Sequence, residues 1–156
     1  MLTIKFHHLR TLIYRPYLYY TCLDGISFPS DQNSQSQKYG RICALEAQCI
    51  ARLMHNVTDT MDIVMNYPWW QMVSCLVCAG SIMVMAGSFM KLDTESEIST
   101  VTLEEDVETC MHVLKASSDN SRGSKLAWDM MKKYPSMRSP SVRTCYCKLY
   151  EELIGV

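Results

Sequence analysis

The stretch that decides the fold class is Phe6-His-His-Leu-Arg-Thr-Leu-Ile-Tyr-Arg-Pro-Tyr-Leu-Tyr19. Its apolar residues return every three to four positions, which predicts an α-helix over residues 2–20. Pro16 lacks a backbone N–H and disfavours helical geometry at Arg15, so the helix is expected to kink or end there. The stripe expected to face the core consists of Ile4, His8, Leu12 or Thr11, Arg15 and Leu18, and it is widened by Leu9, Ile13 and Tyr17.

A polar segment follows this helix. Residues 25–38 consist largely of Ser, Gln, Asn and Asp, a composition that buries too little apolar area to offset the entropy lost on ordering. We therefore expect a flexible linker over 25–38. The helical period returns over residues 41–65, where Ile42, Leu45, Cys49 and Leu53 share one face.

Four further helices are predicted downstream. One runs from Trp69 or Trp70 to Met90, after the break at Pro68. The next begins at Thr102, because Thr102-Leu103-Glu104-Glu105 has the form of a capping box. The last two span residues 124–134 and 141–154, and in the former Leu126, Ala127 and Met130 are expected to face inward.

No segment shows the alternation of a strand, so the predicted fold is all-α. A chain of 156 residues suits one domain, here an irregular bundle of about six helices. The formal net charge is −1, and the basic residues are scattered. Without a basic field or patch, we expect no direct binding of nucleic acid.

The polar residues give no catalytic or metal-binding pattern, and we predict no catalytic residue, no metal ligand and no cofactor in this chain. The eight cysteines are spread out, and the Cys75-x-x-Cys78 pair lies among apolar residues, so packing explains it better than metal or redox chemistry. Without a signal peptide, free cysteines at this density indicate a reducing compartment.

His7 and His8 point to different faces of their helix, one at the core edge and one in solvent. His55 and His112 are each expected to be a surface histidine or one with its hydrogen bonds satisfied, and not a ligand. Glu104, Glu105 and Asp106 are expected to interact with the helix dipole.

The run from Tyr67 to Met90 contains no charged side chain. Such a run is long enough to cross a bilayer, and Trp69 and Trp70 at one end resemble interfacial anchors. Its small residues also suit close packing in a soluble core, and its flanks carry no strong Lys/Arg asymmetry. Both interpretations remain open: a core helix, or the single span of a small membrane protein.

Several phrases, in order, carry a resemblance to a known family. They are Leu9-Arg-Thr-Leu-Ile-Tyr-Arg-Pro16, Cys43-Ala-Leu-Glu-Ala-Gln-Cys-Ile-Ala-Arg-Leu53, Pro68-Trp-Trp-Gln-Met-Val-Ser-Cys-Leu-Val-Cys-Ala-Gly80, Cys110-Met-His-Val-Leu114 and Ala127-Trp-Asp-Met-Met131. Together they resemble the regulatory middle region of fungal zinc-binuclear-cluster transcription factors. The basic six-cysteine DNA-binding module of that family is absent here, as is the earlier half of its middle region.

The resemblance implies a partial regulatory domain over residues 1–156, corresponding to the C-terminal half of a larger helical domain. It implies a non-enzymatic, nuclear module that modulates transcription by RNA polymerase II through protein partners or a small-molecule inducer. Zinc and DNA binding would belong to the absent N-terminal module. The alternatives are the single-span membrane protein, built on residues 67–90, and a nonfunctional truncated fragment.

Overall fold

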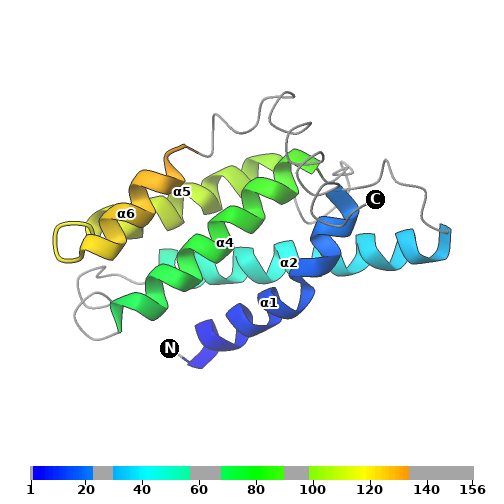
Figure 1. The fold of residues 1–156 in the computed structure, drawn as a ribbon, viewed down its shortest axis with the longest axis horizontal. Helices are drawn as coiled ribbons and strands as arrows, with labels where there is room; N and C mark the ends of the chain where they lie inside the picture. The colour runs from blue at the N-terminus through cyan, green and yellow to red at the C-terminus, as the bar shows by residue number, and fades with distance from the viewer. Residues whose placement is uncertain (1, 23–29, 57–67, 90–98, 134–156) are drawn as a thin grey trace, which may run out of the picture.

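The computed structural model describes residues 2–22, 30–56, 68–89 and 99–133, and in these ranges the chain is helical without strands (Figure 1). The predicted all-α class is therefore confirmed. Five helices are present in the described ranges: α1 (Leu2–Cys22), α2 (Ser30–His55), α4 (Trp69–Phe89), α5 (Thr100–Ala116) and α6 (Arg122–Met131).

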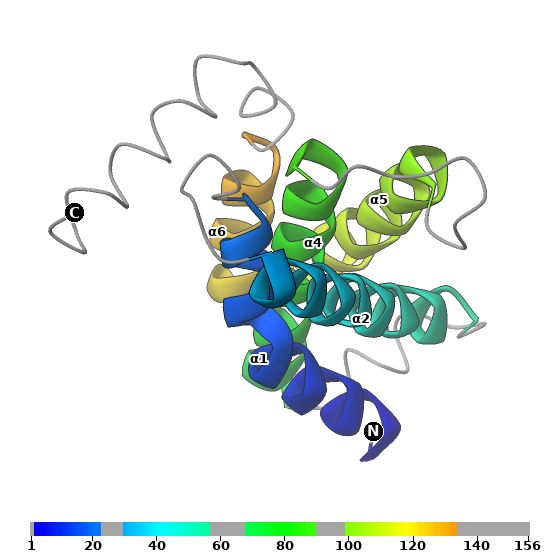
Figure 2. The same ribbon diagram turned by 90° about the vertical axis from the view of Figure 1, so that its right-hand side faces the viewer.

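Helix α4 is the centre of the bundle, because it contacts each of the other four described helices. Helix α1 packs mainly along α2, and α5 and α6 pack on α4 from the other side. Figures 1 and 2 show this arrangement, with α1 at one edge of the bundle. Helix α1 thus has neighbours on one side only, whereas α4 has neighbours on several sides.

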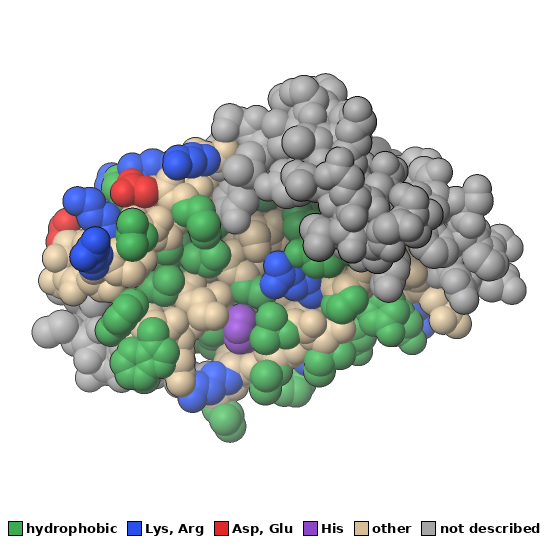
Figure 3. Space-filling model, viewed as in Figure 1, with side chains coloured by type: hydrophobic (Ala, Val, Ile, Leu, Met, Phe, Trp, Pro, Cys, Tyr) green, Lys and Arg blue, Asp and Glu red, His purple; other side chains and the backbone are tan. Residues whose placement is uncertain are grey.

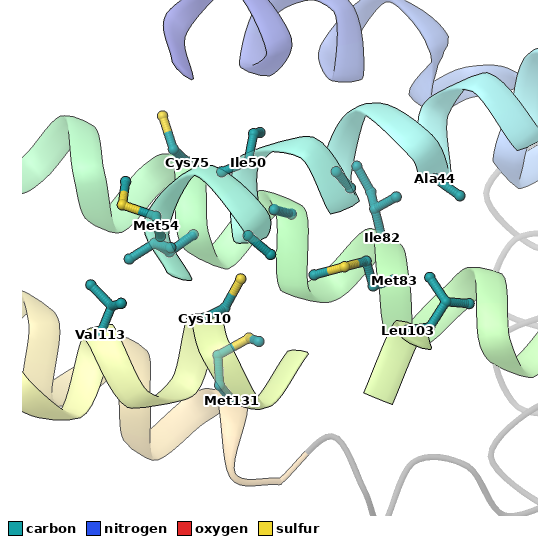
Figure 4. Packing of buried hydrophobic residues seen from close by; sticks show 14 of the residues in the cluster. Ala44, Ile50, Met54, Cys75, Ile82, Met83, Leu103, Cys110, Val113 and Met131 are labelled. Carbon is teal, nitrogen blue, oxygen red and sulfur yellow. The ribbon is translucent and has the colours of Figure 1, made fainter. Parts of the chain in front are cut away.

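The core between these helices combines small residues with flexible methionines (Figure 4). On α2 the buried positions include Cys43, Ala44, Ala47 and Ala51, whose short side chains let neighbouring helices approach. Methionine fills irregular gaps well because its side chain is unbranched and polarisable. Four methionines are fully or almost fully buried: Met54, Met72, Met83 and Met131.

A glycine sets the approach of α6 to α4. A Cβ built on Gly80 would overlap Cε of Met131 and would lie near Cβ of Cys110. Glycine at this position therefore lets α5 and α6 pack against the same face of α4. The predicted helix over 69 or 70–90 agrees with the observed α4 to within one residue.

By length and composition, α4 also meets the criteria for a membrane span. Its segment Trp69–Ser88 has a mean hydropathy of 1.6, and half of its most apolar window is buried within the bundle. A soluble core helix passes the same test, so this feature by itself favours neither interpretation.

The start of α5 differs from the prediction. The helix begins at Thr100, and its N-cap is Ser99, which has extended backbone geometry. The backbone N–H of Thr102 donates to the Ser99 hydroxyl at 3.1 Å, and the backbone N–H of Ser99 donates to the Thr102 hydroxyl at 3.2 Å. Thr102 is thus the inner partner of a capping box and not its cap, because Ser99 supplies an acceptor one turn earlier.

Helix α6 begins two residues earlier and ends three residues earlier than predicted, and a different side of it faces the core. It begins after the N-cap Ser121 and ends at Met131, and it buries Ser124, Ala127 and Met131. The inward assignment was wrong for Leu126 and Met130, which are exposed. Small residues face α4 because the helices are close: a Cβ on Gly123 would overlap the ring of Trp69.

The linker prediction over 25–38 is wrong for residues 30–38, which form the first turns of α2. Just beyond them, the ring of Tyr39 stacks on Tyr14 at 5.7 Å and contacts Tyr17 at 4.8 Å, which ties this part of α2 to α1. Residues 25–29, the segment 57–65 at the end of the second predicted helix, and the predicted helix over 141–154 lie outside the described residues.

Candidate interaction surface on helix α1

Helix α1 continues through Pro16 to Cys22, so the proline does not end it. Figures 1 and 2 show the helix bending in its second half, as expected where a ring replaces a backbone donor. The part before Pro16 forms one straight segment at the edge of the bundle.

Polar groups occupy much of the inner side of α1. Thr11 is completely buried, and its hydroxyl donates to the carbonyl of His7 at 2.6 Å. The carbonyl of Thr11 in turn accepts from the Sγ of Cys43 on α2 at 3.5 Å. Leu18 is the large apolar side chain that α1 buries completely, and Ile4 and Tyr14 are packed against the core in part.

A buried carboxylate fixes how α1 is turned against α2. Glu46 of α2 is buried, and its Oε2 accepts from Nδ1 of His7 at 2.6 Å while its Oε1 accepts from Arg10 at 3.0 Å. A buried charge is tolerated only when it is paired and hydrogen-bonded. Rotating α1 about its axis would break both contacts, so this cluster holds the polar side of α1 inward.

As a consequence, large apolar side chains of α1 face outward. Hydrophobic side chains lie along the lower edge of the molecule, over α1 (Figure 3). We call this set the α1 outer face, and its exposed fractions are Leu2 84%, Phe6 54%, Leu9 60%, Leu12 42% and Ile13 65%. A surface helix normally has the opposite polarity, and a contiguous exposed apolar patch commonly marks a contact site.

This orientation corrects the predicted core stripe of α1. Leu9, Leu12 and Ile13 were expected to face the core and are exposed, and Tyr17 is also exposed at its margin. Thr11 and Leu18 are the members of that stripe that are fully buried. The spacing of apolar residues located the helix correctly. Which side of α1 faces the core depends on Glu46 of α2, and the sequence of α1 alone does not contain this information.

A second polar cluster joins α2 to α5. The side-chain amide of Gln48, itself buried, donates to Asp106 at 2.8 Å and approaches the hydroxyl of Thr102 at 3.4 Å. Arg52 lies 3.6 Å from the same Asp106 carboxylate. Asp106 therefore bridges two helices, a role that the expected interaction with the helix dipole did not include, whereas Glu104 and Glu105 are exposed near the N-terminus of α5.

The cysteines in the core have the properties of packing residues. Burial raises the pKa of the Cys43 and Cys110 thiols to about 12 and that of Cys75 to about 11. Burial also raises the pKa of Cys78, the partner of Cys75 in the C-x-x-C sequence. Because the thiolate is the nucleophile and metal ligand, burial disfavours the reactive form of all four cysteines at neutral pH.

The histidines are placed separately. His7 contacts Glu46, and His8 is half-buried, where burial lowers its pKa, so the expectation that one of the two is solvated was wrong. His55 and His112 are exposed, as expected. Within the described ranges, no three His, Cys, Asp or Glu side chains are grouped so that they could hold a metal ion. Cys145 and Cys147 lie outside those ranges.

The α1 outer face is thus the candidate functional site that the geometry singles out. Comparisons with protein families, with curated proteins and with solved structures found no match to this chain.

Proposed function

We propose that this chain is a non-enzymatic regulatory module of a fungal transcription factor, acting in the nucleus through protein contacts. The α1 outer face is the observation that carries this proposal, because a contiguous exposed apolar patch commonly marks a protein contact site. The face lies on the helix containing Leu9-Arg-Thr-Leu-Ile-Tyr-Arg-Pro16, the first phrase of the family resemblance.

Further support comes from where the other phrases of the resemblance lie. The phrase starting at Cys43 is in α2, the one starting at Pro68 leads into α4, and those starting at Cys110 and Ala127 are in α5 and α6. The first two phrases meet directly, because Arg10 of one pairs with Glu46 of the other. An all-helical bundle built from these phrases in order is what the resemblance implies.

A tethering assay tests the proposed function. The chain is fused to a heterologous DNA-binding domain, and transcription is measured from a reporter that carries the matching site. The wild-type fusion should change transcription, and Leu9→Lys should abolish the change because it places a charge in the middle of the outer face. Leu126→Lys, at an exposed position of α6, is the matched control and should retain the effect. A wild-type fusion that leaves transcription unchanged, while present in nuclei at normal abundance, would overturn the proposal.

The second candidate function is that of a single-span membrane protein. The exposed Trp69 and Trp70 favour it, because they lie at one end of the uncharged segment Trp69–Ser88, where interfacial anchors of a span would lie. Cell fractionation with carbonate extraction separates the two candidates. A tagged chain that stays in the membrane pellet after carbonate and is released by detergent supports a span, whereas release by carbonate supports the soluble bundle.

A further inference from the structure

The sequence spacing between large exposed residues of the α1 outer face is the same from either end of the helix. Leu2, Phe6, Leu9 and Ile13 are separated by four, three and four residues, and all four are exposed. A helix with this pattern is complementary to a copy of itself running antiparallel, because each large side chain then meets another across the two-fold axis. Pro16 follows this straight segment and bends the helix beyond it.

We propose that the α1 outer face binds the same face of a second copy of this chain, forming a symmetric antiparallel helix pair. Leu2 then packs against Ile13 of the second copy, and Phe6 against its Leu9. This inference rests on the proposed function, in which the α1 outer face is a protein contact site. It names a second copy of the chain as the protein that binds there.

The exposed apolar area is a large part of what a stable dimer buries. The exposed parts of Leu2, Phe6, Leu9, Leu12 and Ile13 amount to about three whole large side chains, or roughly 600 Å² at ~200 Å² each. A specific interface of standard size buries about 800 Å² per partner, including its polar rim. The outer face would therefore supply about three quarters of the area of such an interface, and a polar rim would have to supply the rest.

The charges on α1 favour a second copy over an anionic lipid surface. An interfacial membrane helix displays a Lys/Arg-rich polar face beside its apolar one. Here the polar side is turned into the bundle, where Glu46 neutralises Arg10. The guanidinium of Arg15 donates to the neutral hydroxyl of Tyr19 at 2.7 Å and keeps its charge, but Arg15 lies on a different side of α1 from Leu9, so Lys5 is the basic residue at the edge of the outer face. The aliphatic stem of Lys5 can lie along the interface while its ammonium group stays in water.

The mass of the purified full-length chain, measured by sedimentation equilibrium across a range of concentrations, tests the pairing. The wild type should approach twice 17.9 kDa at micromolar concentrations. Leu9→Lys should raise the dissociation constant of the dimer by ~100-fold or more, because a symmetric pair contains the change twice. Leu126→Lys on α6 should remain dimeric. Circular dichroism must show unchanged helix content in both variants.

A mixing experiment tests the register. Phe6→Lys and Leu9→Glu should each be monomeric alone, because each buries an uncompensated charge. An equimolar mixture should form the heterodimer, since Lys at 6 of one chain meets Glu at 9 of the other while Phe6 and Leu9 still meet at the symmetric position. A parallel pair, or contact with a different partner, gives no such rescue.

The outcomes separate this inference from the proposed function. A wild-type chain that is monomeric at all concentrations overturns the pairing, even where Leu9→Lys abolishes the reporter effect and so leaves the proposed function standing. A dimer disrupted by Leu9→Lys supports the pairing even where the tethered chain leaves the reporter unchanged.

Discussion

Helices α1 and α4 are both rich in apolar residues, yet they use them in opposite ways. Helix α4 contacts each of the other four described helices and buries Met72, Leu76, Ala79 and Met83 completely or almost so. Helix α1 has neighbours on one side, and there it places Thr11 and the side chains that pair with Glu46 beside the buried Leu18. The difference teaches that the spacing of apolar residues predicts a helix, whereas the partners of its polar residues decide which side of it is buried.

The largest contrast is expected from the same substitution on each helix. Leu76→Ala should lower the free energy of unfolding by about 3 kcal/mol, because Leu76 is fully buried and its loss leaves a cavity. Leu9→Ala should change it by less than about 0.5 kcal/mol at concentrations low enough to keep the chain monomeric. Urea unfolding monitored by circular dichroism measures both values. Equal losses at the two positions would mean that α1 is buried as α4 is.

A second test adds side-chain volume at a position where α4 is tightly packed. Gly80→Leu should cost about 1–3 kcal/mol, because even a Cβ at this position overlaps Met131. The matched control is Gly87→Ala, whose Cβ would lie at an ordinary 3.8 Å from Leu103. Exchanging this helical glycine for alanine should stabilise the protein by up to ~1 kcal/mol. Thermal unfolding that moves in the same direction for both variants would contradict the packing around α4.

A smaller loss is expected from the carboxylate that orients α1. Glu46→Gln keeps the size of the side chain but removes the charge that faces His7 and Arg10, and it should cost about 1 kcal/mol. The loss stays modest because Arg10 is partly exposed and can turn to water. Glu105→Gln, at an exposed position of α5, is the control and should lie within about 0.5 kcal/mol of the wild type. An unchanged stability in both variants would remove Glu46 as the residue that sets the rotation of α1.

The smallest effect on stability, and the clearest chemical contrast, is expected from Leu9→Cys. The new thiol lies on the exposed side of α1, whereas burial raises the pKa of Cys75 on α4 to about 11. A thiol loses its proton only as the pH approaches its pKa, so at pH 8 about one Cys75 in a thousand is a thiolate. An exposed cysteine at position 9 should react with a thiol reagent far faster, and mass spectrometry of peptides identifies the labelled site. Equally slow labelling of both would place position 9 in a covered environment.

Much of the fold could be predicted from local sequence signals. The all-α class and the extent of α4 follow from hydrophobic periodicity and from the break at Pro68. The capping box of α5 was shifted by one turn because Ser99 and Thr102 both carry hydroxyls suited to a cap. The first turns of α2 were missed because their own composition is polar, and Tyr39 anchors that end through contacts with a different helix.

The candidate site was harder to predict because it depends on pairs of residues far apart in the sequence. Glu46 lies within an otherwise small and apolar stretch of α2, and this isolated carboxylate was the available signal that a basic partner must meet it there. The partners, His7 and Arg10, are 39 and 36 positions earlier. Helical periodicity cannot encode that distance, so it assigned Leu9 and Ile13 to the wrong side.

The methionines of the core also make this protein suitable for solution spectroscopy. Met54, Met83 and Met131 lie on α2, α4 and α6 and are buried, so a carbon-13 label on their ε-methyl groups reports on three different helices. Met130, next to Met131 in sequence, is exposed and serves as an internal solvent reference. A soluble paramagnetic agent would broaden the methyl signal of Met130 and spare that of Met131. The pair therefore detects any detachment of α6 from α4 within one spectrum.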